Sequence, residues 1–142
     1  MKDPVHIRQF QPPDDFERVF ELWDHAGPGV HRGRSDTGEE ITKKQNHDPD
    51  LFLVAEYHGR IIGTVMGGFD GRRGLVYHLT VEEDYRQQGI GANLLETLEE
   101  SLRKKGCLRS YLLITKDNPA IRFYEHHGWQ CLELFAMGKD LQ

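Results

Sequence analysis

Apolar and polar positions change period several times along the chain, with glycine or proline at many of the changes. Short runs that alternate apolar with polar residues, or that are wholly apolar, are typical of strands. They predict strands over residues 5–10, 51–57, 60–69, 75–81, 111–114, 129–131 and 133–137. The wholly apolar run at 111–114 predicts a strand that is buried on both faces.

Four further segments have the spacing or the polarity of surface helices. They predict helices over residues 16–26, 39–45, 90–105 and 119–127. Asp14 or Asp15 is the expected cap of the first helix. Asp117 or Asn118 is that of the last, in which Pro119 takes the first helical position. This alternation predicts an α/β fold of the α+β type, with a twisted mixed sheet of six or seven strands and about four flanking helices.

Composition narrows the class of protein. The 142 residues fit one domain, residues 1–142, and carry a net charge of −5, which disfavours a surface built for nucleic acid. Apolar runs are far shorter than the roughly twenty residues that cross a bilayer, so we expect no membrane partner. Cys107 and Cys131 stand apart, without a CxxC pair or a secretory segment, which predicts free thiols and a cytoplasmic location.

Residues 79–92 run from a predicted strand through a glycine-containing turn into a long helix. The first amides of a helix have no partners within it and the helix dipole is positive there, so such a turn favours an anion. Gly89 and Gly91 would let the backbone approach a pyrophosphate, and Arg86 would add a charge. A tight turn alone is an equally open explanation of both glycines. A dinucleotide fingerprint would need a third glycine where Leu94 stands, and no P-loop lysine follows.

The segment from Arg86 to Ala92, RQQGIGA, resembles the R/Q-x-x-G-x-G/A signature of the GNAT superfamily of N-acetyltransferases. Residues 120–129 resemble the A-I-x-x-Y-E-x-x-G-F segment of that family, and residues 137–141 resemble its last strand. The resemblance covers nearly the whole chain and implies acetyl-CoA as cosubstrate, without a metal. The residues it assigns to the pyrophosphate are Arg86, Gln87, Gln88, Gly89, Ile90, Gly91 and Ala92.

In that family, the strand corresponding to residues 75–81 bends away from its neighbour at 111–114, and the pantetheine arm enters the gap. The resemblance therefore implies a sheet that is splayed between two central strands. It also implies that Leu79 and Val81 contact the arm, and that the amide near Leu79 stabilises negative charge on the thioester carbonyl.

The same resemblance assigns Tyr124 as the general acid that protonates the departing CoA thiolate, with a core aromatic as the alternative. Asn118 would contact the pantetheine or cap its helix. The chain is one residue shorter between this asparagine and the tyrosine than the family pattern, and Asp117 falls at the usual spacing.

A general base is less clearly marked. Some members of the family use a glutamate on the buried strand, where this chain has Leu113. His78 is the candidate, because imidazoles accept protons near neutral pH, and packing in the sheet is an equally open role. Glu82 and Glu83 lie close to it in sequence. The eight histidines have no HxxxH spacing, so no metal site is expected.

These features predict an N-acetyltransferase that moves the acetyl group of acetyl-CoA to a primary amine by direct attack in a ternary complex. Alternatives are a non-catalytic CoA-binding or protein-interaction module on the same fold, and a general phosphate-binding domain. We expect Trp23, Asp24, Asp36, Glu39 and Glu40 to line a pocket for a cationic amine, either a small molecule or a peptide. A homodimer is compatible with the sequence.

Overall fold

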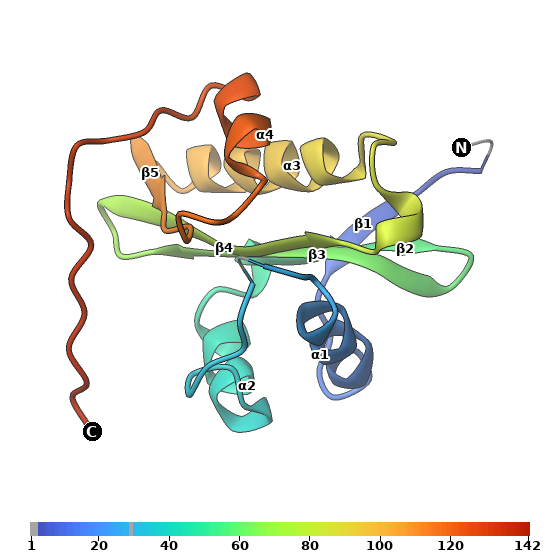
Figure 1. Ribbon diagram of the computed structural model, residues 1–142. Coiled ribbons are helices and arrows are strands. Elements are labelled where there is room, and N and C mark those ends of the chain that lie inside the picture. Colours follow the sequence, from blue (N-terminus) through green and yellow to red (C-terminus); the bar gives the residue numbers. More distant parts are fainter. Residues whose placement is uncertain (1–2, 29) are drawn as a thin grey trace.

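Five strands form one sheet, in the order β1-β2-β3-β4-β5, in the computed structural model, which describes residues 3–28 and 30–142 (Figure 1). The first four strands pair antiparallel, and β5 pairs parallel to β4. The strands are β1 His6–Gln9, β2 Phe52–Tyr57, β3 Arg60–Phe69, β4 Arg73–Val81 and β5 Arg109–Leu112. The α/β class and the strands predicted over residues 51–57 and 60–69 are therefore confirmed.

Helices cover both faces of the sheet (Figure 1). One face carries α1 Phe16–Asp24 and α2 Gly38–His47, and the other carries α3 Ile90–Lys104 and α4 Ile121–His126. Short 3-10 turns, η1 Pro49–Leu51 and η2 Glu83–Tyr85, precede β2 and follow β4. All four predicted helices are confirmed. Within the described part of the chain, no helix is both long and apolar enough to cross a membrane.

Each face of the sheet has its own apolar core, because successive side chains of a strand point to opposite faces. The core under α1 and α2 consists of Phe10, Val19, Leu22, Trp23, Ile41, Phe52, Val54, Ile61 and Met66. The core under α3 and α4 includes Leu53, Ile62, Val65, Val76, Ile90, Leu94, Leu95, Leu98, Leu102 and Tyr124. The leucine spacing of α3 therefore faces the sheet, as its sequence predicts.

Glycines on β3 bring α3 close to the sheet. A Cβ at Gly67 would lie 2.8 Å from a methyl carbon of Leu98, and one at Gly63 would lie 3.1 Å from Leu94. Both separations are shorter than ordinary van der Waals contact between carbons. The two glycines thus allow the leucines of α3 to fill the space that side chains on β3 would otherwise occupy.

The prediction of six or seven strands is wrong, since the sheet has five. Residues 129–142 contain neither helix nor strand, so the strands predicted at 129–131 and 133–137 are absent. The outer edge of β5 consequently has no neighbour in the described chain, and Leu113 is 74 % exposed instead of buried. An apolar run indicates that a segment favours a strand, but burial on both faces also needs a neighbouring strand or helix.

Two predicted helix caps also differ. Asp15 is the N-cap residue of α1, but its carboxylate makes no capping hydrogen bond and instead accepts hydrogen bonds from Arg8 and from the Gln11 amide. Ala120 is the N-cap of α4, so neither Asp117 nor Asn118 caps this helix, and Pro119 lies outside the first helical position.

Strands β4 and β5 separate after four paired positions. The pairs run from Arg73 with Arg109 to Val76 with Leu112. Beyond them β4 continues to Val81 without a partner on that side among the described residues. The predicted divergence is present, but it lies between an inner strand and the edge strand, not between two central strands.

Candidate active site

A β-bulge interrupts β4 at His78. One residue of β3 lies between Thr64 and Met66, whereas two residues of β4, His78 and Leu79, lie between their partners. His78 accommodates the extra residue with a φ of 49°, in the left-handed region. As a result Tyr77 and His78 both line the cleft on the α2 face, where regular alternation would place them on opposite faces.

His78 is held by a buried carboxylate. Its Nε2 atom lies 3.2 Å from Oδ2 of Asp36, whose side chain is only 7 % exposed. The Gly33 N–H donates to the same oxygen at 2.8 Å, and the Trp23 ring lies 5.0 Å from the imidazole between centroids. A hydrogen bond from Nε2–H to the carboxylate leaves the lone pair of the neutral ring on Nδ1. This arrangement suits a proton acceptor.

Leu79 and Val81, beyond the bulge, pack against the core on the α3 face. The pairing with β5 ends before this part of β4. Main-chain groups on that side of β4 therefore have no strand partner among the described residues and face a gap. A Cβ at Gly91 would lie 3.6 Å from Phe123 and 3.7 Å from Val81. The end of β4 therefore lies close to the first turn of α3 and to α4, beside the gap.

Unpaired helix amides follow the turn after β4. Gly89 has a φ of 82° and is the N-cap residue of α3. Asn93 is the first residue of the helix whose N–H reaches an intrahelical acceptor, the Gly89 carbonyl at 3.0 Å. The N–H groups of Ile90, Gly91 and Ala92 thus have no acceptor within the helix and lie at its positive end. Such a cluster of donors suits a phosphate.

The other residues predicted for this turn are exposed. Gln87 has a φ of 62°, so two left-handed residues shape the turn. Gln88 is exposed next to it. Arg86 donates from Nε to the Val81 carbonyl at 2.8 Å, which ties the turn to the end of β4. The predicted phosphate-binding residues therefore lie together on one surface of the molecule.

Tyr124 is the buried tyrosine of α4, with 8 % of its surface exposed. Its ring lies 5.4 Å from that of Phe123 and 6.2 Å from that of Trp129, between centroids. Burial raises the pKa of its phenol to about 12. Tyr124 thus packs as a core aromatic, and it keeps its proton at neutral pH, as a proton donor must.

Asn118 and Glu82 have local roles. The Asn118 Oδ1 atom accepts a hydrogen bond from the Ala120 N–H at 2.8 Å, so its side chain stabilises the turn before α4. Glu82 forms ion pairs with Arg60 at 2.6 Å and with Arg18 at 3.1 Å. Both ion pairs lie outside the cleft that His78 lines, which makes Glu82 a poor candidate for the base.

A cleft of about 1130 Å³ opens on the α2 face of the sheet, beside His78 and Asp36. Its apolar lining includes Met66, Leu75, Tyr77, Tyr111 and Leu113. Its polar lining, contributed by α2 and the residues that flank it, includes Asp36, Glu40, Lys43, Lys44 and His47. The cleft is large enough to hold a small-molecule ligand.

The predicted acidic pocket is only partly present. Asp36 and Glu40 line the cleft, but Glu40 is paired with Lys43 at 2.7 Å. Asp24 pairs with Arg32 at 3.3 Å, and Trp23 is buried in the core. The contact of Asp36 with His78 has no local sequence signal. Within residues 3–28 and 30–142, no three His, Cys, Asp or Glu side chains gather as a metal site.

The free amides at the start of α3, the gap beside the end of β4 and the cleft on the other face of the same strand fit a CoA-dependent acyltransferase. The family follows from comparison with known proteins. Residues 14–129 match the acetyltransferase (GNAT) family, and the chain belongs to this family. It is accordingly an acetyl-CoA-dependent acyltransferase.

Bacterial relatives match over the length of the chain. An acetyltransferase of Pectobacterium atrosepticum is 43 % identical over 138 residues, which cover 96 % of each chain. An acetyltransferase of Sodalis glossinidius is 44 % identical over 139 residues, again 96 % of each chain. An N-acetyltransferase of Yersinia pestis described as uncharacterized is 43 % identical.

Solved structures show the same fold. Ard1 of Thermoplasma volcanium has a TM-score of 0.75 at 25 % identity and covers 87 % of this chain and 81 % of its own. The PaiA N-acetyltransferase of Thermoplasma acidophilum, solved in complex with coenzyme A, has a TM-score of 0.80 at 20 % identity, with 94 % of each chain covered. At 20 % identity, the similarity to the PaiA N-acetyltransferase shows only a shared fold.

Proposed function

We propose that the protein is an N-acetyltransferase that moves the acetyl group of acetyl-CoA to a primary amine by direct attack in a ternary complex. The main support for this proposal is the β-bulge at His78. It directs His78 toward the cleft, while Leu79 and Val81 lie beside the gap. Acetyl-CoA and the amine would then approach β4 from opposite sides.

The residues of the turn fit a CoA diphosphate. The three free amides of Ile90, Gly91 and Ala92 provide hydrogen-bond donors, and exposed Arg86 provides positive charge nearby. Bound acetyl-CoA supplies an acetyl thioester. Main-chain groups of Leu79 and Val81 pair with the pantetheine arm, and the Leu79 N–H stabilises negative charge on the thioester oxygen.

His78 acts as the general base. An alkylammonium has a pKa near 10.4, so at neutral pH the acceptor must lose a proton before it attacks. Nδ1 of His78 takes this proton, directly or through one water, and Asp36 stabilises the resulting imidazolium through Nε2–H. An ordinary imidazole lies about four pKa units below the amine, so this transfer costs roughly 5 kcal/mol before Asp36 contributes.

Tyr124 stabilises the leaving thiolate through its hydroxyl group. Its raised pKa, about 12, keeps the hydroxyl protonated over the working pH range. The same high pKa makes complete transfer to a thiolate of ordinary basicity unfavourable, so the hydroxyl acts mainly as a hydrogen-bond donor to the sulfur. Asn118 holds the turn before α4 and thereby positions Tyr124.

The acceptor is a small molecule or a peptide with a cationic amine. The apolar part of the lining would contact the acceptor's carbon skeleton, and Asp36 would attract its charge. The open cleft accommodates both classes of acceptor. A cytoplasmic location agrees with the two free cysteines, Cys107 and Cys131.

A thiol-release assay with acetyl-CoA and a panel of amines tests the proposal. The panel should include polyamines, amino sugars, amino acids and peptides, with thermal unfolding measured in parallel. Stabilisation by acetyl-CoA together with thiol release is expected. Stabilisation without thiol release for any amine would favour the non-catalytic CoA-binding module. Equal stabilisation by ADP would favour a general phosphate-binding domain.

A further inference from the structure

Two arginines at one end of the cleft have no acidic partner. Arg73 begins β4 and lines the cleft, and Arg109 begins β5 as its partner in the sheet. The guanidinium carbon of each lies 5.5 Å from the centroid of the Tyr111 ring, which also lines the cleft. Neither forms an ion pair with a carboxylate of the described chain, and the nearby Asp70 carboxylate accepts the main-chain N–H groups of Arg72 and Arg73 instead. Arg73 and Arg109, called here the arginine pair, thus concentrate positive charge at one place.

The other cations in the lining of the cleft are paired. On α2, Lys43 lies 2.7 Å from Glu40, and Lys44 lies 3.1 Å from Asp48, just beyond the helix. All four residues line the cleft, so their charges largely cancel there. Arg73 is the one lysine or arginine of the described lining without a carboxylate partner. An anionic group of a ligand would therefore bind at the arginine pair and not beside α2.

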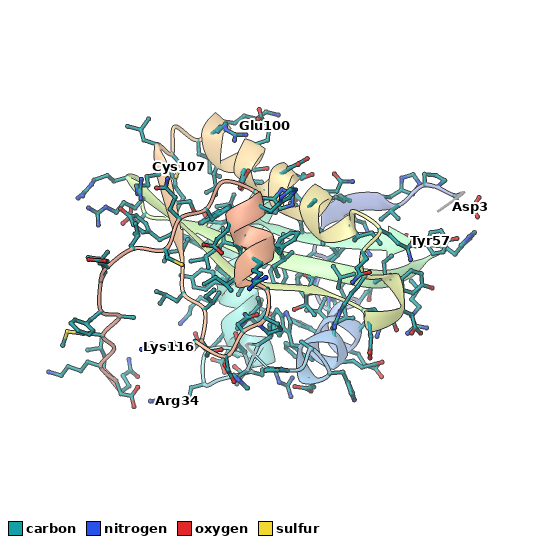
Figure 2. The ribbon with its side chains drawn as sticks, turned by 45° about the horizontal axis from the view of Figure 1, so that its top comes forward. Asp3, Arg34, Tyr57, Glu100, Cys107 and Lys116 are labelled. Carbon is teal, nitrogen blue, oxygen red and sulfur yellow. The ribbon has the colours of Figure 1, made fainter. Side chains whose placement is uncertain are left out.

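The arginine pair and the proposed base lie apart along one strand. Arg73, Leu75, Tyr77 and His78 follow one another on β4, and all of them line the cleft. His78 is five positions beyond Arg73, which is about 16 Å at the rise of a regular strand. Figure 2 shows Cys107 just before β5, at the end of the sheet that carries the arginine pair. Strand β4 therefore offers a cation, an apolar stretch and a proton acceptor in one row.

We propose that the arginine pair is an anion subsite that selects the acceptor, a peptide whose N-terminal amine reaches His78 and whose fourth or fifth residue has an anionic side chain. This inference rests on the proposed function and names the substrate class of the same site. An extended peptide advances about 3.3–3.6 Å per residue, so four or five residues span the distance along β4. Free amino acids and amino sugars are too short to reach both ends.

The size of the cleft and the chemistry of the amine both favour a peptide. At about 1130 Å³, the cleft exceeds the roughly 300–1,000 Å³ of typical small-molecule sites. The α-amino group of a peptide has a pKa of about 8, against about 10.4 for an alkylamine, so it gives its proton to an imidazole at a lower cost. Leu75 and Tyr77 would contact the side chains between the two ends of the peptide.

A guanidinium suits an anion subsite because its N–H groups bind a carboxylate or a phosphate in a bidentate manner. The Tyr111 ring restrains both guanidiniums through cation–π contacts, so less side-chain freedom is lost when the anion binds. Carboxylate and phosphate share this chemistry, so an acidic residue and a phosphoserine are both expected to bind. Both arginines are exposed, which limits the expected gain in affinity to about fivefold.

Acetylation kinetics of matched pentapeptides test the proposal. The peptides contain no lysine and end in an amide, so the N-terminal amine is the only primary amine and the C-terminus carries no charge. They differ only at the fourth and fifth residues, both of which are glutamine, glutamate, phosphoserine or arginine. The KM is expected to be about fivefold lower for the glutamate and phosphoserine peptides than for the glutamine peptide, and higher for the arginine peptide. The kcat should be similar for all four, since the reacting amine is the same.

Two further comparisons locate the subsite. Moving the two glutamates to the second and third residues should remove their advantage, because they would no longer reach the arginine pair. A lower KM for only one of the two anions would support the subsite and identify the group that it binds.

The double variant Arg73→Gln/Arg109→Gln should lose the preference, with equal KM values for the glutamine and glutamate peptides. Its fold should be retained, since both side chains are exposed. Arg72→Gln is the matched control, because Arg72 is an exposed arginine next to Arg73 that does not line the cleft. This control should keep the preference.

Equal KM values for the glutamine, glutamate and phosphoserine peptides in the wild type would overturn the proposal and leave acetyl transfer intact. So would a preference that survives the double substitution, or acetylation of other amines but of no peptide. If no amine releases thiol, the proposed function fails, and calorimetric binding of the glutamate peptide in the presence of CoA tests the subsite by itself. Binding about fivefold weaker in the double variant would support the subsite, and equal or absent binding would overturn it.

Discussion

The side chains of His78 and Asp36, 42 residues apart in sequence, meet with 3.2 Å between Nε2 and Oδ2. Asp36 belongs to the loop before α2, and its carboxylate is fixed by the Gly33 N–H. The bulge in β4 directs the imidazole toward that loop. The dyad therefore depends on two irregular pieces of backbone that come from different parts of the chain.

We expect His78→Ala to lower kcat about a hundredfold at neutral pH, because the acceptor must then lose its proton to solvent. The loss should shrink as the pH approaches 10, where amines deprotonate unaided. Asp36→Asn should lower kcat about tenfold and leave the KM for acetyl-CoA unchanged, since it weakens both the orientation of the imidazole and the stabilisation of its charged form. Thiol release measured against pH checks both variants.

His47→Ala is the matched control for these variants, because His47 lines the same cleft but its side chain is 73 % exposed. It should retain the wild-type rate. A loss in His78→Ala that is equal at all pH values would show that His78 has a structural role and is not the base.

The two glycines of the turn should respond differently to substitution by alanine. Gly89 has a φ of 82°, so Gly89→Ala strains the backbone and should reduce stability by about 1 kcal/mol. At Gly91 the new methyl group would lie at ordinary contact distance from Phe123 and Val81, so Gly91→Ala should fold normally. The methyl group would narrow the route beside the gap and raise the KM for acetyl-CoA severalfold.

Thermal unfolding and the KM for acetyl-CoA, measured on both glycine variants, check this difference. A Gly91→Ala protein with a wild-type KM would show that the cosubstrate does not pass between Val81 and Phe123.

The buried Asp15 should make stability depend on pH in acid. Burial alone would raise the pKa of its carboxyl, but hydrogen bonds from Arg8 and from the Gln11 amide hold it below its usual value. The stabilisation is therefore complete above about pH 4 and is lost as the pH falls through the lowered pKa. Asp15→Asn should cost roughly 1–3 kcal/mol at neutral pH by urea unfolding, and less in acid. Asp14→Asn, at an exposed neighbouring position, should have little effect.

Local patterns predicted the parts of the fold that local forces determine. The leucine spacing of α3 and the glycine turn before it depend on residues close in sequence, and the structure has both. The α2 helix also follows its polar sequence, with the Thr37 side chain accepting a hydrogen bond from the Glu40 N–H. These elements place the predicted phosphate-binding amides together.

The features that local sequence patterns could not predict depend on contacts between residues far apart in the chain. His78 adopts a positive φ that no pattern of apolar residues indicates, and its pairing with Asp36 depends on how α1 and α2 pack under the sheet. The final strands were predicted from apolar alternation at 133–137, but a strand also needs a partner with a free edge. In the described chain this segment forms no ladder with the free edge of β5.

A phenylalanine substitution separates the proton-donor role of Tyr124 from its packing role in the core. Tyr124→Phe keeps the ring and its contacts with Phe123 and Trp129, so the fold should remain intact. Loss of the hydroxyl should lower kcat about tenfold to a hundredfold, because the thiolate leaves without a hydrogen bond. Tyr57→Phe, at a half-buried tyrosine outside the gap, should retain the wild-type rate. Wild-type turnover by Tyr124→Phe would show that Tyr124 has only a packing role.

Stability at high pH gives a second, independent measurement on the same residue. The pKa of Tyr124 is raised from 10.0 to about 12 by burial, so the folded state resists ionisation more than the unfolded state does. This contribution to stability is complete below pH 10 and is lost between pH 10 and 12, by about 3 kcal/mol at most. Tyr124→Phe should remove that part of the alkaline loss in urea titrations. An unchanged alkaline loss in the variant would mean that the hydroxyl of Tyr124 is hydrated in the folded protein, leaving its pKa near that of an exposed tyrosine.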